Sequence, residues 1–198
     1  SVNNIMIALY AFVIISFFIT IVDIIIRFPL QSEMIDYNDI QAIVINVLAL
    51  LIQIVFFAYG FVNAIRGMLS PKRMGAVITA FFAATCITGT GNMVIYSNVQ
   101  IVLWWIVLII PNIVGAVATF AYFVLGKKSK IYSIIIYLVA IWGMFRIIYS
   151  NYNLIVHANQ YLSMNSTVRL VLGIAIHCLV IYQTYVLWIK RQNAIDIS

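Results

Sequence analysis

The sequence predicts an all-α integral membrane protein, a compact bundle of six transmembrane helices with both termini in the cytoplasm. Of the 198 residues, 65% are hydrophobic and only 8% are charged, and the mean hydropathy is +1.11. Soluble domains carry about 25% charged residues, so this chain has too few charges to cover a surface that faces water. Its apolar residues also fall into stretches of ~20 residues or more, the length needed to cross a ~30 Å hydrocarbon core.

Six stretches reach this length, and the connections between them are short. We expect helices, because a helix satisfies its backbone hydrogen bonds within the segment and the alternating pattern of a membrane β-barrel is absent. The expected spans cover about residues 5–27, 40–65, 74–96, 101–126, 131–150 and 168–189. They use nearly the whole chain, so we expect one transmembrane domain over residues 1–198 and no soluble domain.

The basic residues gather in alternate connections. Eight of the 11 Lys and Arg residues flank the second and fourth connections or follow the last span: Arg66, Lys72, Arg73, Lys127, Lys128, Lys130, Lys190 and Arg191. Cytoplasmic loops of membrane proteins carry an excess of Lys and Arg, so this distribution places the N- and C-termini in the cytoplasm. Isoleucine outnumbers leucine, a bias typical of AT-rich genomes, and we expect the bilayer to be a bacterial cell membrane.

The individual spans carry further signals. The first lacks the basic start and the small-residue cleavage site of a signal peptide, so we expect it to be retained. In the third, Gly89 and Gly91 predict either local unwinding or close packing against a neighbouring helix. In the fourth, Pro111 predicts a kink. Residues 151–163, between the last two spans, have roughly helical spacing and predict either a helix on the outer surface or an extension of the fifth span.

Polar side chains occur in several spans at a similar depth, in the outer half of the bilayer. Ionisable residues at such depth normally face the bundle interior or a watered cavity. The sequence therefore predicts an outward-opening polar cavity, with five candidate ligand-binding residues: Asp23, Asn46, Asn92, Arg146 and His177. The alternative for the amides and the histidine is structural, because such groups also hydrogen-bond between membrane helices.

The charges at this depth need partners. Asp23 has Arg27 one turn away on its own helix, and Arg146 lies at a similar level in the fifth span. We expect an Asp23–Arg146 bridge in preference to a local Asp23–Arg27 pair. Otherwise Arg146 is an anion-binding group for the carboxylate or phosphate of a solute.

Enzyme chemistry is not expected. The chain has two histidines, His157 and His177, no HExxH or GxSxG motif and no nucleotide-binding glycine loop. We therefore expect no catalytic residues, no metal site, no cofactor and no nucleic-acid partner, and we interpret Cys86 and Cys178 as small buried apolar residues.

Two function classes remain. The first is a small-solute binding or transport subunit that depends on a partner for energy. Its topology resembles that of the vitamin-binding subunits of energy-coupling-factor importers, and the segment FPL…IDYNDI, residues 28–40, is similar to the loop after their first helix. The resemblance implies a cytoplasmic ATPase that docks on the basic inner loops, near residues 66–73 and 127–130. The second class is a non-transporting membrane subunit: a sensor, an immunity factor or a structural partner in a larger membrane complex. A pore ranks below both, because no single helix carries a polar stripe.

Overall fold

The structure, a computed structural model, describes residues 2–31, 37–96, 105–151 and 164–195. Near several helix ends, which include Asp23 and Asn92, only the backbone is described. The described ranges are helical apart from short turns and contain no strand. The predicted surface helix at residues 151–163 lies almost wholly outside them.

The described ranges hold six helices that are long and apolar enough to cross a membrane, which confirms the predicted all-helical class. The fourth of them is built of three consecutive segments. In chain order the elements are α1 (Val2–Gln31), α2 (Tyr37–Ile65), α3 (Pro71–Tyr96), η2 (Trp105–Ile109), α5 (Ile110–Thr119), η3 (Phe120–Val124), α6 (Lys130–Ser150) and α9 (Met164–Ile195).

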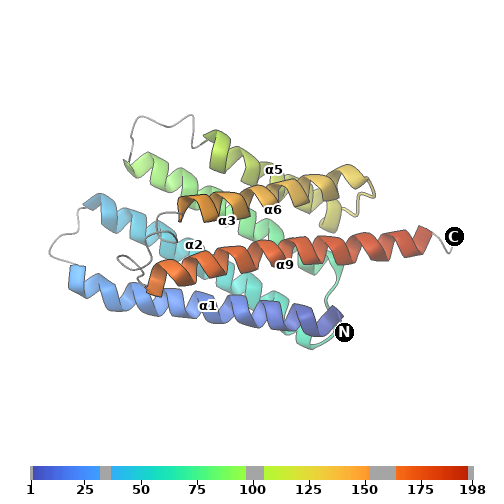
Figure 1. Cartoon of the computed structure of the whole chain (residues 1–198), viewed down its shortest axis with the longest axis horizontal. Helices are drawn as coiled ribbons and strands as arrows, with labels where there is room; N and C mark the ends of the chain where they lie inside the picture. The colour runs from blue at the N-terminus through green and yellow to red at the C-terminus, as the bar shows by residue number, and fades with distance from the viewer. Residues whose placement is uncertain (1, 32–36, 97–104, 152–163, 196–198) are drawn as a thin grey trace.

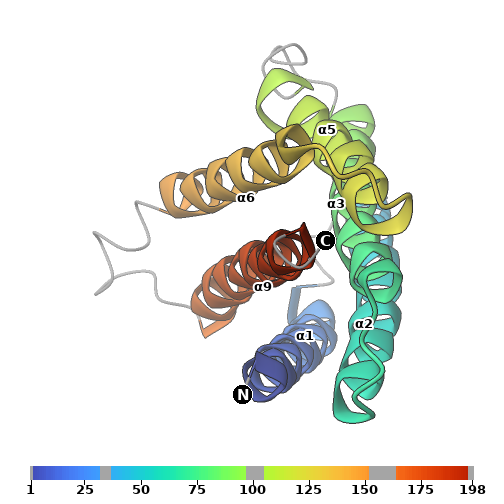
Figure 2. The same cartoon turned by 90° about the vertical axis from the view of Figure 1, so that its right-hand side faces the viewer.

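The helices form two layers of three. One layer holds α2, α3 and α5, and the other holds α1, α9 and α6 (Figure 2). Each helix packs against the next along the chain, and α9 lies between α6 and α1 and closes the ring. Because α3 and α9 are the middle helices of their layers, they also contact each other across the bundle.

Successive helices run in opposite directions, so α1 begins and α9 finishes at the same end of the bundle (Figure 1). The turns after α2 and η3 also lie at this end, and a glycine with positive φ forms each of them: Gly67 (66°) and Gly126 (69°). Only glycine adopts this conformation readily. The eight cations of the second and fourth connections and the C-terminal segment therefore share one end of the molecule, which we call the basic end.

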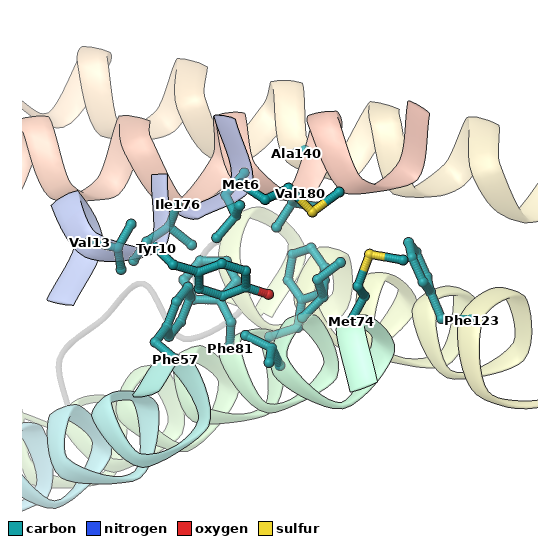
Figure 3. Packing of buried hydrophobic residues seen from close by; sticks show 14 of the residues in the cluster. Met6, Tyr10, Val13, Phe57, Met74, Phe81, Phe123, Ala140, Ile176 and Val180 are labelled. Atoms are coloured by element: carbon teal, nitrogen blue, oxygen red, sulfur yellow. The ribbon is translucent and has the colours of Figure 1, made fainter. Parts of the chain in front are cut away.

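The core lies between the two layers. All six membrane-length helices contribute to it, as the labelled side chains in Figure 3 show. Large apolar side chains also cover the outside of the bundle; Val55, for example, is 66% exposed and Val117 62%. A surface of this kind is stable only when its surroundings are apolar, as expected for helices that span a bilayer.

The fourth helix is irregular, and Pro111 lies in the first turn of its middle segment, α5. Proline has no N–H to donate to the carbonyl four residues earlier, which here belongs to Val107. The indole Nε1 of Trp142, from α6, donates to that carbonyl at 2.8 Å instead. The chain adopts a wider π-helical turn over η2, which ends two residues before Pro111. A neighbouring helix thus satisfies the carbonyl that proline leaves free, and the kink itself stays a prediction.

The small residues of α3 promote close packing and not unwinding. The helix is continuous through Tyr96. A Cβ atom at Gly89 would lie 2.6 Å from Leu108 Cδ2, and one at Gly91 would lie 2.8 Å from Ile45 Cδ1. Gly89 therefore brings α3 against the fourth helix and Gly91 brings it against α2.

Candidate functional site

The structure describes the side chains of three of the five predicted cavity residues. The side chains of Asp23, in α1, and Asn92, in α3, lie outside the described residues. The remaining three, Asn46, Arg146 and His177, are described and lie on α2, α6 and α9.

His177 occupies the centre of the bundle. It is 3% exposed, and its Nδ1 atom lies 2.6 Å from the carbonyl oxygen of Gly173, one turn earlier in α9. A carbonyl can only accept a hydrogen bond, so Nδ1 carries the proton in this contact. In the neutral ring Nε2 is then left as an acceptor, and it lies where a side chain at Gly143 of α6 would be.

Aromatic packing fixes the histidine from the other layer. The ring of Phe81, in α3, contacts it edge to face, with centroids 5.3 Å apart and an interplanar angle of 88°. The imidazole is thus held by its own helix, by Gly143 and by Phe81, at the point where the two middle helices meet.

Arg146 lies one turn beyond Gly143 on α6, toward the end of the bundle opposite the basic end. It is half-buried. Two other residues of the same stretch, Val139 and Trp142, contact the fourth helix through Gly115 and the Val107 carbonyl. Helical spacing places Arg146 between this contact face and the Gly143 face that meets α9. The backbone of Arg146 therefore lies on the side of α6 that meets the fourth helix, in the same layer as His177.

Asn46 lies in the other layer, away from Arg146 and His177. Its helix, α2, packs against α1 and α3, and its described residues do not pack against α6 or α9. The Asn46 amide donates to the Ala42 carbonyl of its own helix at 2.7 Å. Of the described candidates, Arg146 and His177 thus lie on neighbouring helices of one layer, and Asn46 lies on a helix of the other layer.

Local hydrogen bonding is general for the polar side chains of the spans. Most of those described donate to the carbonyl four residues earlier in the same helix. Examples are Ser16, Thr20, Asn63, Thr85, Thr88, Asn112 and Thr184. These donors neither bridge helices nor point to a ligand, because each is satisfied within its own helix.

A few polar contacts do join helices, and their residues are not among the predicted site residues. The Gln183 amide of α9 donates to the hydroxyl of Tyr10 in α1, and both side chains are fully buried. Gln183 could have been found from its spacing, because it follows Ile176, Leu179 and Val180 on one helical face. At the basic end, Arg191 donates to the carbonyls of Tyr122 and Lys127 at 2.8 and 3.0 Å, and its guanidinium lies 4.2 Å from the Tyr122 ring centroid.

No group of three or more His, Cys, Asp or Glu residues suited to a metal occurs among the described residues. Cys86 and Cys178 are both free thiols and lie half-buried in the spans. The Cys86 Sγ atom lies 3.8 Å from the Ile109 carbonyl, next to the π-helical turn of the fourth helix.

No protein-family model, curated protein or solved structure matches this chain.

Proposed function

We propose that the chain is a subunit of a bacterial cell membrane, with cytoplasmic termini, that binds a small anionic solute in the outer half of its bundle for transport. The observation that carries the proposal is Arg146, a half-buried cation of α6 that lies one turn from Gly143, where the buried His177 meets this helix. A charge in this position is costly unless an anion accompanies it. Its planar fork of donors suits a carboxylate or a phosphate.

Two anions are available to Arg146. One is a bound solute, and the other is Asp23, whose bridge to Arg146 stays a prediction. The two residues belong to α6 and α1, the outer helices of one layer, and α9 lies between them (Figure 2). Because α9 separates these two helices, we take a bound solute as the anion that accompanies Arg146.

Thermal unfolding of the purified protein tests the proposal. A panel of small carboxylates and phosphates is added, with neutral analogues of the same size. An anion at one hundred times its dissociation constant should raise the Tm by about 5–10 °C. Arg146→Gln should abolish that shift, whereas Lys128→Gln, which removes an exposed cation at the basic end, should leave it unchanged. If Arg146→Gln folds and no anion stabilises the unmodified protein, the proposal is wrong.

The chain offers no nucleotide-binding motif in its sequence, so transport needs an energy source from a partner. We place the docking site on the basic end, at the turns over residues 66–73 and 127–130. Six of its cations are exposed there and available to an acidic surface: Arg66, Lys72, Lys127, Lys128, Lys130 and Lys190. Lys127→Glu with Lys128→Glu should weaken co-purification of a cytoplasmic ATPase, and Gln41→Glu, which adds an acidic group at the opposite end, should not.

A second candidate is a non-transporting subunit of a larger membrane complex. The observation in its favour is that most described polar side chains of the spans hydrogen-bond within their own helix, as packing groups do. Under this alternative, anions leave the melting curve unchanged and a second membrane protein co-purifies in constant proportion from native membranes.

A further inference from the structure

Two cavities adjoin α9 in its half toward the basic end. The first is a groove of about 570 Å³ and the second is a pocket of about 510 Å³ at the basic end, and Tyr182 and Tyr185 line both. Because they share these two side chains, the two cavities are adjacent. Neither is lined by Arg146 or His177, so both are independent of the proposed outer site.

The groove faces the membrane. It runs over α9 between α1 and α6, which flank that helix on either side (Figure 2). Its lining is almost wholly apolar and aromatic: Leu9, Tyr137, Cys178, Ile181 and Trp188, besides the two shared tyrosines. Such a groove accepts a hydrocarbon chain, because nearly all of the surface that lines it is apolar.

The basic-end pocket has a different character. Its floor is apolar, with Met6, Met74 and Val186, and its rim carries the ammonium of Lys190 and the amide of Asn3. Lys190 is exposed, and the Asn3 amide donates to the Ala64 carbonyl at 3.1 Å, which holds α1 against the end of α2. A cation beside a polar amide at the membrane boundary suits an anionic headgroup.

The length of the combined surface matches one leaflet. From Lys190 to Cys178, α9 advances by twelve residues, about 18 Å at the helical rise. Half of a ~30 Å hydrocarbon core is about 15 Å. A molecule with its headgroup at Lys190 therefore reaches the level of Cys178 with an extended acyl chain.

The geometry points to a binding site for an anionic phospholipid of the leaflet at the basic end. Its phosphate lies at Lys190 and Asn3, and one acyl chain lies along Tyr185, Ile181 and Cys178. A soluble anion would bind at the pocket but would leave the apolar groove empty. A lipid without net charge would fill the groove but would gain less from the charge of Lys190.

Quenching of Trp188 by brominated acyl chains tests the inference. The full chain is placed in phosphatidylcholine nanodiscs that contain increasing amounts of brominated phosphatidylglycerol or brominated phosphatidylcholine. The signal of Trp188 is taken as the difference between the unmodified protein and Trp188→Phe. Phosphatidylglycerol should reach half-maximal quenching at an about fivefold lower mole fraction than phosphatidylcholine.

Two matched variants decide the role of the charge. Lys190→Gln should remove the preference for phosphatidylglycerol, and Lys128→Gln, at the same end but outside the pocket, should keep it. Equal quenching by the two lipids in the unmodified protein overturns the inference, and so does an equal loss in both variants. Loss of the preference on addition of millimolar glycerol phosphate also overturns it, since the site would then bind a free anion without a chain.

Discussion

Gly143 has no Cβ atom, and the imidazole of His177 occupies the space that a side chain at this position would fill. The imidazole is held on its other sides by the Gly173 carbonyl and by the edge of Phe81, so the ring has nowhere to move. The position of the buried histidine therefore depends on a residue in a different helix that has no side chain.

Gly143→Ala should lower the Tm, because the new methyl group collides with a fixed ring. Overpacking of this kind costs about 1–3 kcal/mol. Gly91→Ala is the matched control: its Cβ would meet Ile45 Cδ1, the end of a flexible side chain, and the loss should be smaller. Thermal unfolding in detergent measures both. Equal losses, or an undiminished cost of Gly143→Ala in a His177→Ala background, would contradict this explanation.

The Tyr10–Gln183 contact joins the first and last helices in the core. Tyr10→Phe removes the hydroxyl that accepts from the Gln183 amide, and the stranded amide should cost about 1–2 kcal/mol of unfolding free energy. Tyr10→Phe with Gln183→Leu removes both polar groups and should be more stable than Tyr10→Phe alone. A double-mutant cycle from equilibrium unfolding tests this, and strictly additive effects would argue against the contact.

At the scale of the element, the fourth helix departs most from regular geometry. Pro111 leaves the Val107 carbonyl without its usual donor, and Trp142 supplies one from α6. The irregularity of one helix is thus coupled to a side chain of another, which ties these two helices together at that level.

Trp142→Phe should destabilise the protein by about 1–2 kcal/mol, because the Val107 carbonyl then lacks a donor. Pro111→Ala restores a backbone N–H that can donate to the same carbonyl. In a Pro111→Ala background, Trp142→Phe should therefore cost less. Comparison of the four melting curves gives the coupling, and an unchanged cost in the Pro111→Ala background would show that Trp142 acts through its size alone.

Hydropathy predicts the helices of this chain well and the rotation of each helix poorly. In a bilayer both the outward and the core-facing side chains are apolar, so Leu48, 55% exposed, and Phe57, 1% exposed, look alike in the sequence. The depth of a residue in the bilayer follows from its position along the span, which is why the sequence predicts His177 as a cavity residue. Which neighbour a polar group meets cannot be read, and Asn46 accordingly bonds its own helix. The pairing of Gln183 with Tyr10 depends on α9 lying next to α1, which no local pattern encodes.

At the scale of the whole molecule, the gathering of cations at one end supports the proposed orientation. In a variant with Cys86→Ala and Cys178→Ala, single cysteines at Ser70 or Ser129 should react with a membrane-impermeant maleimide only after the cells are permeabilised. A cysteine at Ser150, which is exposed at the opposite end, should react in intact cells. The reverse pattern would place the basic end outside.

The location of α9 between α1 and α6 has a consequence for biogenesis. Of the described helices, α9 is the last to leave the ribosome, yet it is the one that closes the ring. While the chain is being inserted, α1 has α2 as its neighbour, and the Tyr10 hydroxyl does not yet have its hydrogen bond from Gln183. Closure of the bundle is therefore a late event that follows the synthesis of all the other described helices.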